Sequence, residues 1–194
     1  MNHKTLLDYI NKHINLTVEE EAILFSKVVH RNYLKDQYIV QQGDTCKHTN
    51  FIISGCTKTF YMDEKGQEHI VMFSIEDWWT SDLGSFITQT PADFNVQCLE
   101  NTQLIQFTTE SLEALYIEIP KLERFFRKVA ERAIVASQKR IIQNFSLSAI
   151  ERYQIFKKTY PEIDQRVPQY MIASYLGITK EFLSKIKSEL IQKQ

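Results

Sequence analysis

The stretch VPQYMIASYLGITKEFLSKIKSEL, residues 167–190, decides how the C-terminal part of this chain folds. Its pattern predicts two short helices joined by a tight turn. Ile172 and Leu176 mark the inner face of the first helix, and Gly177 ends it because glycine adopts a positive φ at little cost. Thr179 can cap the second helix at its N-terminus. The apolar stripe of the second helix, at helical spacing, consists of Leu183, Ile186 and Leu190.

Two helices that cross at a short turn with glycine are typical of the helix-turn-helix, which places its second helix in the major groove of DNA. Ala173, four residues before Gly177, is small enough to let the two helices approach closely. The alternative is an αα-hairpin that only packs within a helical core. Because the small, glycine and apolar positions all agree with the helix-turn-helix, we expect the C-terminal part to bind double-stranded DNA.

The bulk composition limits the class of protein. The 194 residues are 43% apolar and 24% charged, as in ordinary soluble globular proteins. No apolar run approaches the roughly 18 residues that a membrane-spanning helix needs, and the N-terminus lacks the pattern of a signal peptide. Cys46, Cys56 and Cys98 are an odd and scattered set, which is typical of a reducing compartment. We therefore expect a cytoplasmic protein without a membrane partner.

Charge is distributed unevenly along the chain. Residues 1–119 hold 8 basic and 17 acidic residues, whereas residues 120–194 hold 15 basic and 7 acidic residues. A basic C-terminal part that carries the helix-turn-helix pattern favours contact with a polyanion. The alternative is a pair of solvated faces of opposite sign.

Helical and β-rich segments divide the rest of the chain. Residues 4–28 are predicted to be helical, and capping boxes pair Thr17 with Glu20 and, much later, Ser148 with Glu151. Between them, short β-rich runs alternate with turn signals at intervals of about 8–12 residues. These runs are residues 38–40, 51–53, 57–61, 69–73, 94–99 and 103–107. Strands at this spacing predict an antiparallel jelly-roll or barrel.

After Thr108, which can cap a helix over residues 111–119, the pattern stays helical. Pro120 permits a new helix that continues without Pro or Gly to residue 145. At 1.5 Å per residue this helix is roughly 39 Å long, more than a small barrel covers. We therefore expect it to pair with the same helix of a second subunit; the alternative is that it packs on its own barrel alone. The residues expected at this dimer interface are Leu122, Phe126, Val129, Ala133 and Ala136.

A barrel, a long linking helix and a helix-turn-helix in this order resemble the Crp/Fnr family of bacterial transcription regulators over nearly the whole chain. The residues that carry the resemblance are 51–55 (FIISG), 63–68 (DEKGQE), 83–86 (LGSF), 140–142 (RII) and 173–179 (ASYLGIT). The resemblance implies a homodimer whose barrels sense a signal, long helices that relay it, and paired recognition helices that enter successive major grooves. RNA polymerase is a further candidate partner.

The recognition helix of the family has the pattern Ser/Thr-Arg-Glu-Thr/Ser-x-x-Arg, and residues 179–185 here are TKEFLSK. Lys can donate to guanine O6 and N7, and Glu can accept from cytosine N4. Helical spacing places residues 180, 181, 184, 185 and 188 on the face opposite Leu183, Ile186 and Leu190. The expected DNA-binding residues are therefore Thr179, Lys180, Glu181, Ser184, Lys185 and Ser188. Lys in place of Arg lacks a planar fork, which weakens discrimination. Phe182 replaces a small polar residue, and it either touches a thymine methyl or packs inward.

The sensor site departs further from the family. Its cyclic-nucleotide binders hold the phosphate with a Gly-Glu-Leu turn and, some ten residues on, an Arg-Ser/Thr pair. Here Ser81 and Asp82 replace the Gly and the Glu, and no Arg lies between Arg31 and Arg124. The expected effector pocket consists of Ser81, Asp82, Leu83, Gly84, Ser85, Ala92 and Asp93. A phosphate beside the Asp82 and Asp93 carboxylates would be unfavourable, so we expect no cyclic AMP binding; the pocket takes another ligand or none.

Other function classes have weaker signals. Iron–sulfur sensing needs four cysteines, and the three here are scattered. His48 and His69 with Glu68 are a candidate metal site, as in a cupin-type enzyme built on a jelly-roll. A barrel interaction module whose helical tail packs on a protein is a further alternative. We expect no metal, no iron–sulfur cluster and no catalytic residues.

We therefore predict an α+β fold in three parts. Residues 1–119 form an N-terminal antiparallel β jelly-roll effector barrel, residues 120–146 a long dimerisation helix, and residues 147–194 a helix-turn-helix domain. The predicted function is that of a homodimeric, sequence-specific DNA-binding regulator of transcription, and not that of an enzyme.

Overall fold

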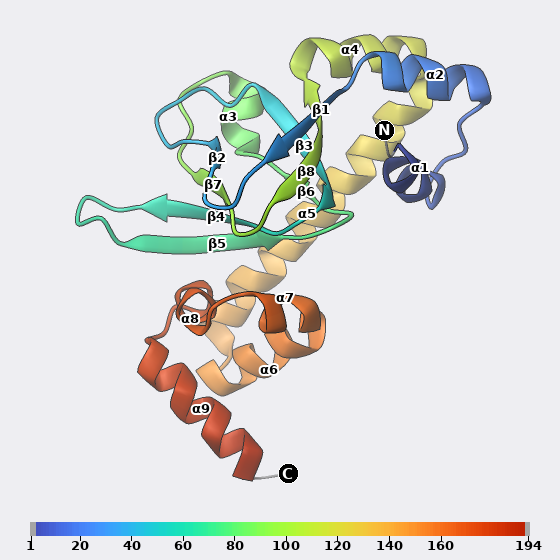
Figure 1. Ribbon diagram of the computed structural model, residues 1–194. Coiled ribbons are helices and arrows are strands. Elements are labelled where there is room, and N and C mark those ends of the chain that lie inside the picture. The colour runs from blue at the N-terminus through green and yellow to red at the C-terminus, as the bar shows by residue number, and fades with distance from the viewer. Residues whose placement is uncertain (1–2, 193–194) are drawn as a thin grey trace.

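A computed structural model describes residues 3–192 as a barrel, a long helix and a helical C-terminal domain (Figure 1). The predicted α+β fold class is confirmed. In the described part of the chain, none of the helices has both the length and the hydropathy that crossing a membrane demands.

Within residues 3–192, eight strands form the barrel. They are β1 (Val29–Tyr33), β2 (Tyr38–Val40), β3 (His48–Ser54), β4 (Thr57–Met62), β5 (Glu68–Ser74), β6 (Trp79–Thr80), β7 (Asn95–Cys98) and β8 (Thr102–Thr108). Two antiparallel four-stranded sheets result, in the orders β1-β8-β3-β6 and β2-β7-β4-β5. All six β-rich runs predicted from the sequence fall on strands. Strands β1 and β6 are not predicted from the sequence. The sequence of β1, VHRNY, lacks apolar alternation, and the strand is held by its pairing with β8.

Helices cover one end of the barrel. These are α1 (Lys4–Asn11), α2 (Val18–Ser26) and α4 (Thr109–Glu118), which gather around the start of α5 (Pro120–Ser146) in Figure 1. The short helix α3 (Leu83–Thr88) lies on the barrel between β6 and β7. The capping box of Thr17 and Glu20 is present, and the Thr108 hydroxyl accepts the Ser111 N–H at the start of α4. Both predicted caps are confirmed.

The first half of α5 packs on its own barrel. Leu122 has 0% exposed surface, and the ring of Phe126 lies 5.0 Å from that of Trp79. The prediction that Leu122 belongs to a dimer interface is therefore wrong, and Phe126 and Val129 also pack against the core of the subunit itself. The helical spacing of these apolar residues correctly predicts one buried face. Spacing alone does not show whether that face packs on the barrel of the same subunit or on a second subunit. Residues 130–139, farther along the helix, are all exposed.

The C-terminal domain contains four helices within the described residues: α6 (Ala149–Thr159), α7 (Pro161–Arg166), α8 (Gln169–Leu176) and α9 (Lys180–Gln192). The predicted capping box of Ser148 and Glu151 opens α6. The sequence analysis predicts no helix at α7, since a proline is usually read as the end of a helix. Pro161 also starts α7, since the first position of a helix needs no N–H donor.

Candidate nucleic-acid interface

The turn between α8 and α9 forms as its sequence predicts. Gly177 adopts a left-handed conformation with φ of 67°, and the N–H of Ile178 donates to the Ala173 carbonyl at 3.0 Å. This pairing closes the C-terminal end of α8. The Thr179 hydroxyl then accepts the N–H of Phe182 at 3.2 Å, which caps α9.

Buried apolar residues fix the rotation of α9 about its axis. Leu183 and Ile186 have 0% and 1% exposed surface, and they pack with Ile172 and Leu176 of α8 in one cluster. Because these residues face inward, the opposite face of α9 is turned to solvent.

The solvent face of α9 carries every predicted DNA-binding residue. All six are exposed: Thr179, Lys180, Glu181, Ser184, Lys185 and Ser188. Within residues 3–192, Lys180 and Lys185 form neither an ion pair nor a hydrogen bond through their side chains. Their ammonium groups are thus free to meet phosphates or base edges. Ser188 differs, because its hydroxyl donates to the Ser184 carbonyl at 3.1 Å within the helix.

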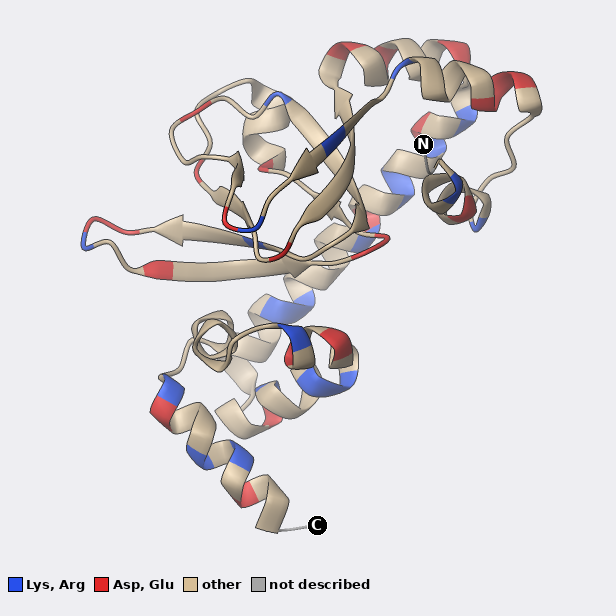
Figure 2. Ribbon diagram, in the orientation of Figure 1, with Lys and Arg blue, Asp and Glu red and all other residues tan. Residues whose placement is uncertain are grey.

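Two neighbouring residues complete this surface. Phe182 is 45% exposed, so the alternative that it packs inward is wrong. Lys187 donates to the Gln169 side chain at 2.8 Å and therefore pins α9 to α8. Figure 2 shows basic residues along α5, α7 and α9, with some acidic residues among them, while acidic residues also gather on the barrel loops and on the helices at its end.

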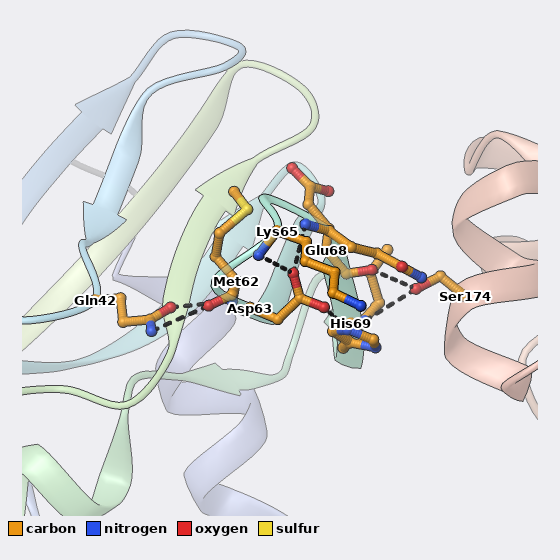
Figure 3. A network of polar contacts seen from close by, with 9 residues as sticks. Gln42, Met62, Asp63, Lys65, Glu68, His69 and Ser174 are labelled. Carbon is orange, nitrogen blue, oxygen red and sulfur yellow. Dashed lines mark hydrogen bonds and ion pairs between the residues drawn. The ribbon is translucent and has the colours of Figure 1, made fainter.

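The first helix of the pair is docked on the barrel. Strand β5 lies at the edge of its sheet, so one row of its backbone groups has no neighbouring strand. The Ser174 hydroxyl of α8 accepts the N–H of Ile70 at 3.1 Å and donates to the Glu68 carbonyl at 2.9 Å. Figure 3 shows Ser174 reaching the strand from the helix. One side chain thus satisfies two backbone groups that an adjacent strand would otherwise bond.

Arg140 of α5 holds the same strand from a second direction. Its guanidinium donates to the Ile70 carbonyl at 3.3 Å, to the Val71 carbonyl, and to the Tyr175 carbonyl of α8 at 3.2 Å. It also lies 4.1 Å from the centroid of the Tyr175 ring. The long helix, the barrel edge and the helix-turn-helix therefore meet at one residue.

A salt bridge clamps the other end of the C-terminal domain. Arg166 of α7 donates to Glu76 and to Glu100, both at 2.7 Å, and these carboxylates lie in two different barrel loops. Burial raises the pKa of Glu76, but the hydrogen bonds from Arg166 and from the backbone N–H groups of Glu76 and Gly55, with the charge of Arg166, together hold that pKa below its ordinary value. Sequence reasoning missed these contacts because the bonded residues lie 66 and 90 positions apart.

The candidate metal ligands of the sequence do not come together. His69 pairs with Asp63 at 2.9 Å in the β4–β5 hairpin, which Figure 3 shows, and this bond lowers the pKa of Asp63. His48 lies on β3, in the other sheet. In the part of the chain that the structure describes, no three His, Cys, Asp or Glu side chains gather as a metal site. The cupin-type alternative therefore has no support here.

The expected effector pocket is closed by its own residues. Asp82 caps α3, and its carboxylate accepts the N–H groups of Ser85 at 2.9 Å, Asp93 at 2.9 Å and Phe94 at 3.0 Å. The Ser85 hydroxyl donates to the Thr90 carbonyl and accepts the Cys46 N–H. Asp82, Ser85 and Ala92 are buried; Leu83, Gly84 and Asp93 are exposed, and Ser81 is half-buried. The Asp82 carboxylate thus occupies N–H donors that a bound anion would need.

Cavities elsewhere among residues 3–192 include a small one on the barrel and a larger groove. One of about 350 Å³ lies along β2 and the loop after it, where Asp44, His48 and Asn50 line it. The other, of about 940 Å³, is a mainly apolar groove between α5, β5 and the C-terminal domain. Val129, Ala133 and Ala136, three of the expected dimer residues, line this groove.

Sequence similarity links the chain to known regulators. Residues 30–118 match a family model described as the cyclic nucleotide-binding domain. The transcriptional activator protein Anr of Pseudomonas protegens is 23% identical over 171 residues, which cover 82% of this chain and 69% of Anr. The anaerobic regulatory protein of Haemophilus influenzae is 26% identical over 183 residues, which cover 87% of this chain and 70% of that protein.

Solved structures show the same fold. The structure of FixK2 from Bradyrhizobium japonicum superposes with a TM-score of 0.72 at 15% identity, and the match covers 86% of this chain and 85% of FixK2. The match extends beyond the barrel, so the barrel, the long helix and the C-terminal helices occur together in both proteins.

Proposed function

We propose that the chain is a transcription regulator of the Crp/Fnr family, to which it is similar, and that it binds double-stranded DNA sequence-specifically as a homodimer. The observation that carries the proposal is the solvent face of α9. Lys180, Glu181 and Lys185 are exposed there, and Thr179 caps the start of the helix. Lys180 and Lys185 would donate to guanine or phosphate, and Glu181 would accept from cytosine. Thr179 and Ser184 would position the helix on the phosphate backbone.

The dimer in this proposal forms along the second half of α5. Ile134, Ile141 and Phe145 are 58%, 55% and 87% exposed, and they recur at intervals of seven and four residues on one face. This is the spacing of helices that pair along a seam. An apolar stripe of this kind, beside a groove of about 940 Å³, is consistent with a second copy of α5 as its partner.

The sensor barrel in this proposal does not respond to cyclic AMP. The family match establishes the fold of residues 30–118, but phosphate binding depends on a free set of N–H donors and a cation. Asp82 already takes the donors of Asp93 and Phe94, and it adds a negative charge at that place. An anionic ligand would have to displace a buried carboxylate that is bonded three times.

A selection from a random DNA library, made with the purified protein, tests the proposed function. We expect a two-fold symmetric motif whose half-sites lie about 34 Å, one helical turn, apart. Binding should weaken steeply as salt rises, because Lys side chains release counterions from phosphates. Enrichment of no sequence, together with salt-independent behaviour, would favour the alternative of a barrel module that binds a protein.

The dimer is tested separately by the double variant Ile134→Glu and Ile141→Glu. Two charges in an apolar seam should convert the dimer to a monomer in analytical ultracentrifugation, and DNA affinity should fall at least about 100-fold because both half-sites must bind together. Ile117→Glu is the matched control, since Ile117 is 81% exposed on α4. A double variant that remains dimeric would place the interface elsewhere.

A further inference from the structure

Phe182 is an aromatic residue on a surface that otherwise carries charged and hydroxyl side chains. It is the third residue of α9 and is 45% exposed. Its neighbours Leu183 and Ile186 supply the buried side of the helix, so Phe182 is not needed to hold α9 in place.

The position of Phe182 places it among the expected base-reading residues. Its N–H is held by the Thr179 hydroxyl at 3.2 Å, which fixes the first turn of α9. Residues three apart on a helix are surface neighbours, so Phe182 lies beside Lys185, and Glu181 precedes it directly. The N-terminal residues of a recognition helix are those that contact base edges.

The charged residues near Phe182 favour G·C pairs and leave A·T pairs without a specific contact. Lys donates to guanine and Glu accepts from cytosine, so Lys180, Glu181 and Lys185 favour G·C pairs. Thymine differs from the other bases by a C5-methyl group in the major groove, which Phe contacts by apolar packing.

We propose that Phe182 is a specificity-determining residue that contacts the C5-methyl group of one thymine in each half-site. The proposal rests on the proposed DNA-binding function and names an additional base that α9 reads. Contact between Phe182 and the methyl group removes apolar surface of both from water. Neither a phosphate nor the major-groove edge of guanine presents such an apolar group.

The test uses the operator found by selection, with its thymines replaced one at a time by deoxyuridine. Deoxyuridine keeps every hydrogen-bonding group of thymine and lacks only the methyl group. At one thymine per half-site, the replacement should weaken wild-type binding about 4-fold, which corresponds to one buried methyl group. For Phe182→Ala, the same replacement should have no effect, because the contact is already lost.

Controls separate this proposal from the function on which it rests. Ile191→Ala removes apolar surface from the last turn of the same helix, where Ile191 is 72% exposed, and should keep the deoxyuridine effect. Phe182→Ser, which introduces a small polar residue, should behave like Phe182→Ala, and circular dichroism checks that both variants fold.

The outcomes are distinguishable. If wild-type protein binds its operator and no deoxyuridine replacement matters, Phe182 does not read a methyl group while the proposed function stands. Phe182 is likewise excluded as the reader of the methyl group if Phe182→Ala still loses affinity on deoxyuridine. A protein that enriches no DNA would overturn both proposals.

Discussion

Helices α3 and α9 both begin with a capping side chain, but the two caps differ in charge and in the number of N–H groups that they accept. Asp82 caps α3 with a buried carboxylate that accepts three backbone N–H groups, including two from the loop at residues 93–94. Thr179 caps α9 with a neutral hydroxyl that accepts one N–H, and two exposed lysines follow on the solvent face. A cap that brings its own charge consumes the donors, whereas a neutral cap leaves the surface open to phosphate. The fold of a ligand-binding domain therefore does not by itself secure the ligand.

The largest effect is expected when Asp82 is replaced by Ala. Three N–H groups, one in the first turn of α3 and two in the loop at residues 93–94, would lose their acceptor, so the free energy of unfolding should fall by about 3 kcal/mol. Urea unfolding of the purified protein measures it. Asp93→Ala is the control, because Asp93 is exposed in the same loop and should change stability by less than about 0.5 kcal/mol. Equal costs for the two variants would show that the Asp82 bonds do not hold the loop.

At the open helix, Lys180→Ala and Lys185→Ala should spare stability and weaken binding. Each variant should lose about 1–3 kcal/mol of operator affinity. If the lysine contacts a base, base preference should relax. If it contacts a phosphate, the slope of log affinity against log salt concentration should fall in magnitude by about 1. Fluorescence anisotropy over a salt series measures both quantities. Lys187→Ala is the matched control, because Lys187 bonds to Gln169 and should affect folding more than binding. Unchanged ratios of operator to random-DNA affinity in both variants, with unchanged salt slopes, would remove these lysines from the interface.

A smaller effect is expected at the clamp between the two regions. Arg166→Ala should cost about 1 kcal/mol, since the pair is partly solvated, and amide exchange at Ile70 should become faster as α8 leaves the strand. Arg127→Ala, which breaks an exposed pair with Glu131, should leave that exchange unchanged. The folded pKa of Glu76 lies below its ordinary value of 4.5, so the clamp should persist above that pH and weaken only as pH falls through the folded pKa.

The smallest effect is expected from cyclic AMP on the wild-type protein. A ligand that binds only the folded state raises Tm with its concentration, and the closed loop should give no such rise. Differential scanning fluorimetry over a concentration series measures this. A rise in Tm that grows with cyclic AMP would mean that the Asp82 bonds open for the ligand, and the contrast between the two helices would then be lost.

Local signals make much of this structure predictable. The caps at Thr17, Thr108 and Ser148, the turn at Gly177 and six of the strands depend on residues within a few positions of each other. The exposure of the α9 residues follows from the inward spacing of its leucine and isoleucine side chains.

Contacts between distant residues are not predictable in the same way. The apolar spacing of α5 correctly predicts the helix, but it leads to the wrong contact for Leu122, which packs on the barrel of its own subunit. The charge of Asp82 is a reason to expect that phosphate is excluded, but its bonds to the Asp93 and Phe94 N–H groups have no signal in the sequence. Likewise, nothing near Ser174 in the sequence indicates that its hydroxyl bonds to the backbone of β5, about a hundred residues earlier.

The cover that α8 gives to β5 also bears on the solubility of the protein. A bare edge strand is a template on which another chain can add a strand, and this is a common start of aggregation. Ser174 and Arg140 occupy the Ile70 backbone groups, and the ring of Tyr175 lies 5.6 Å from that of Phe73. The C-terminal domain therefore covers the edge at which a second barrel could otherwise add a strand. A fragment cut before α6 would expose the outer edge of β5, and it should associate through this edge more readily than the chain with its C-terminal domain.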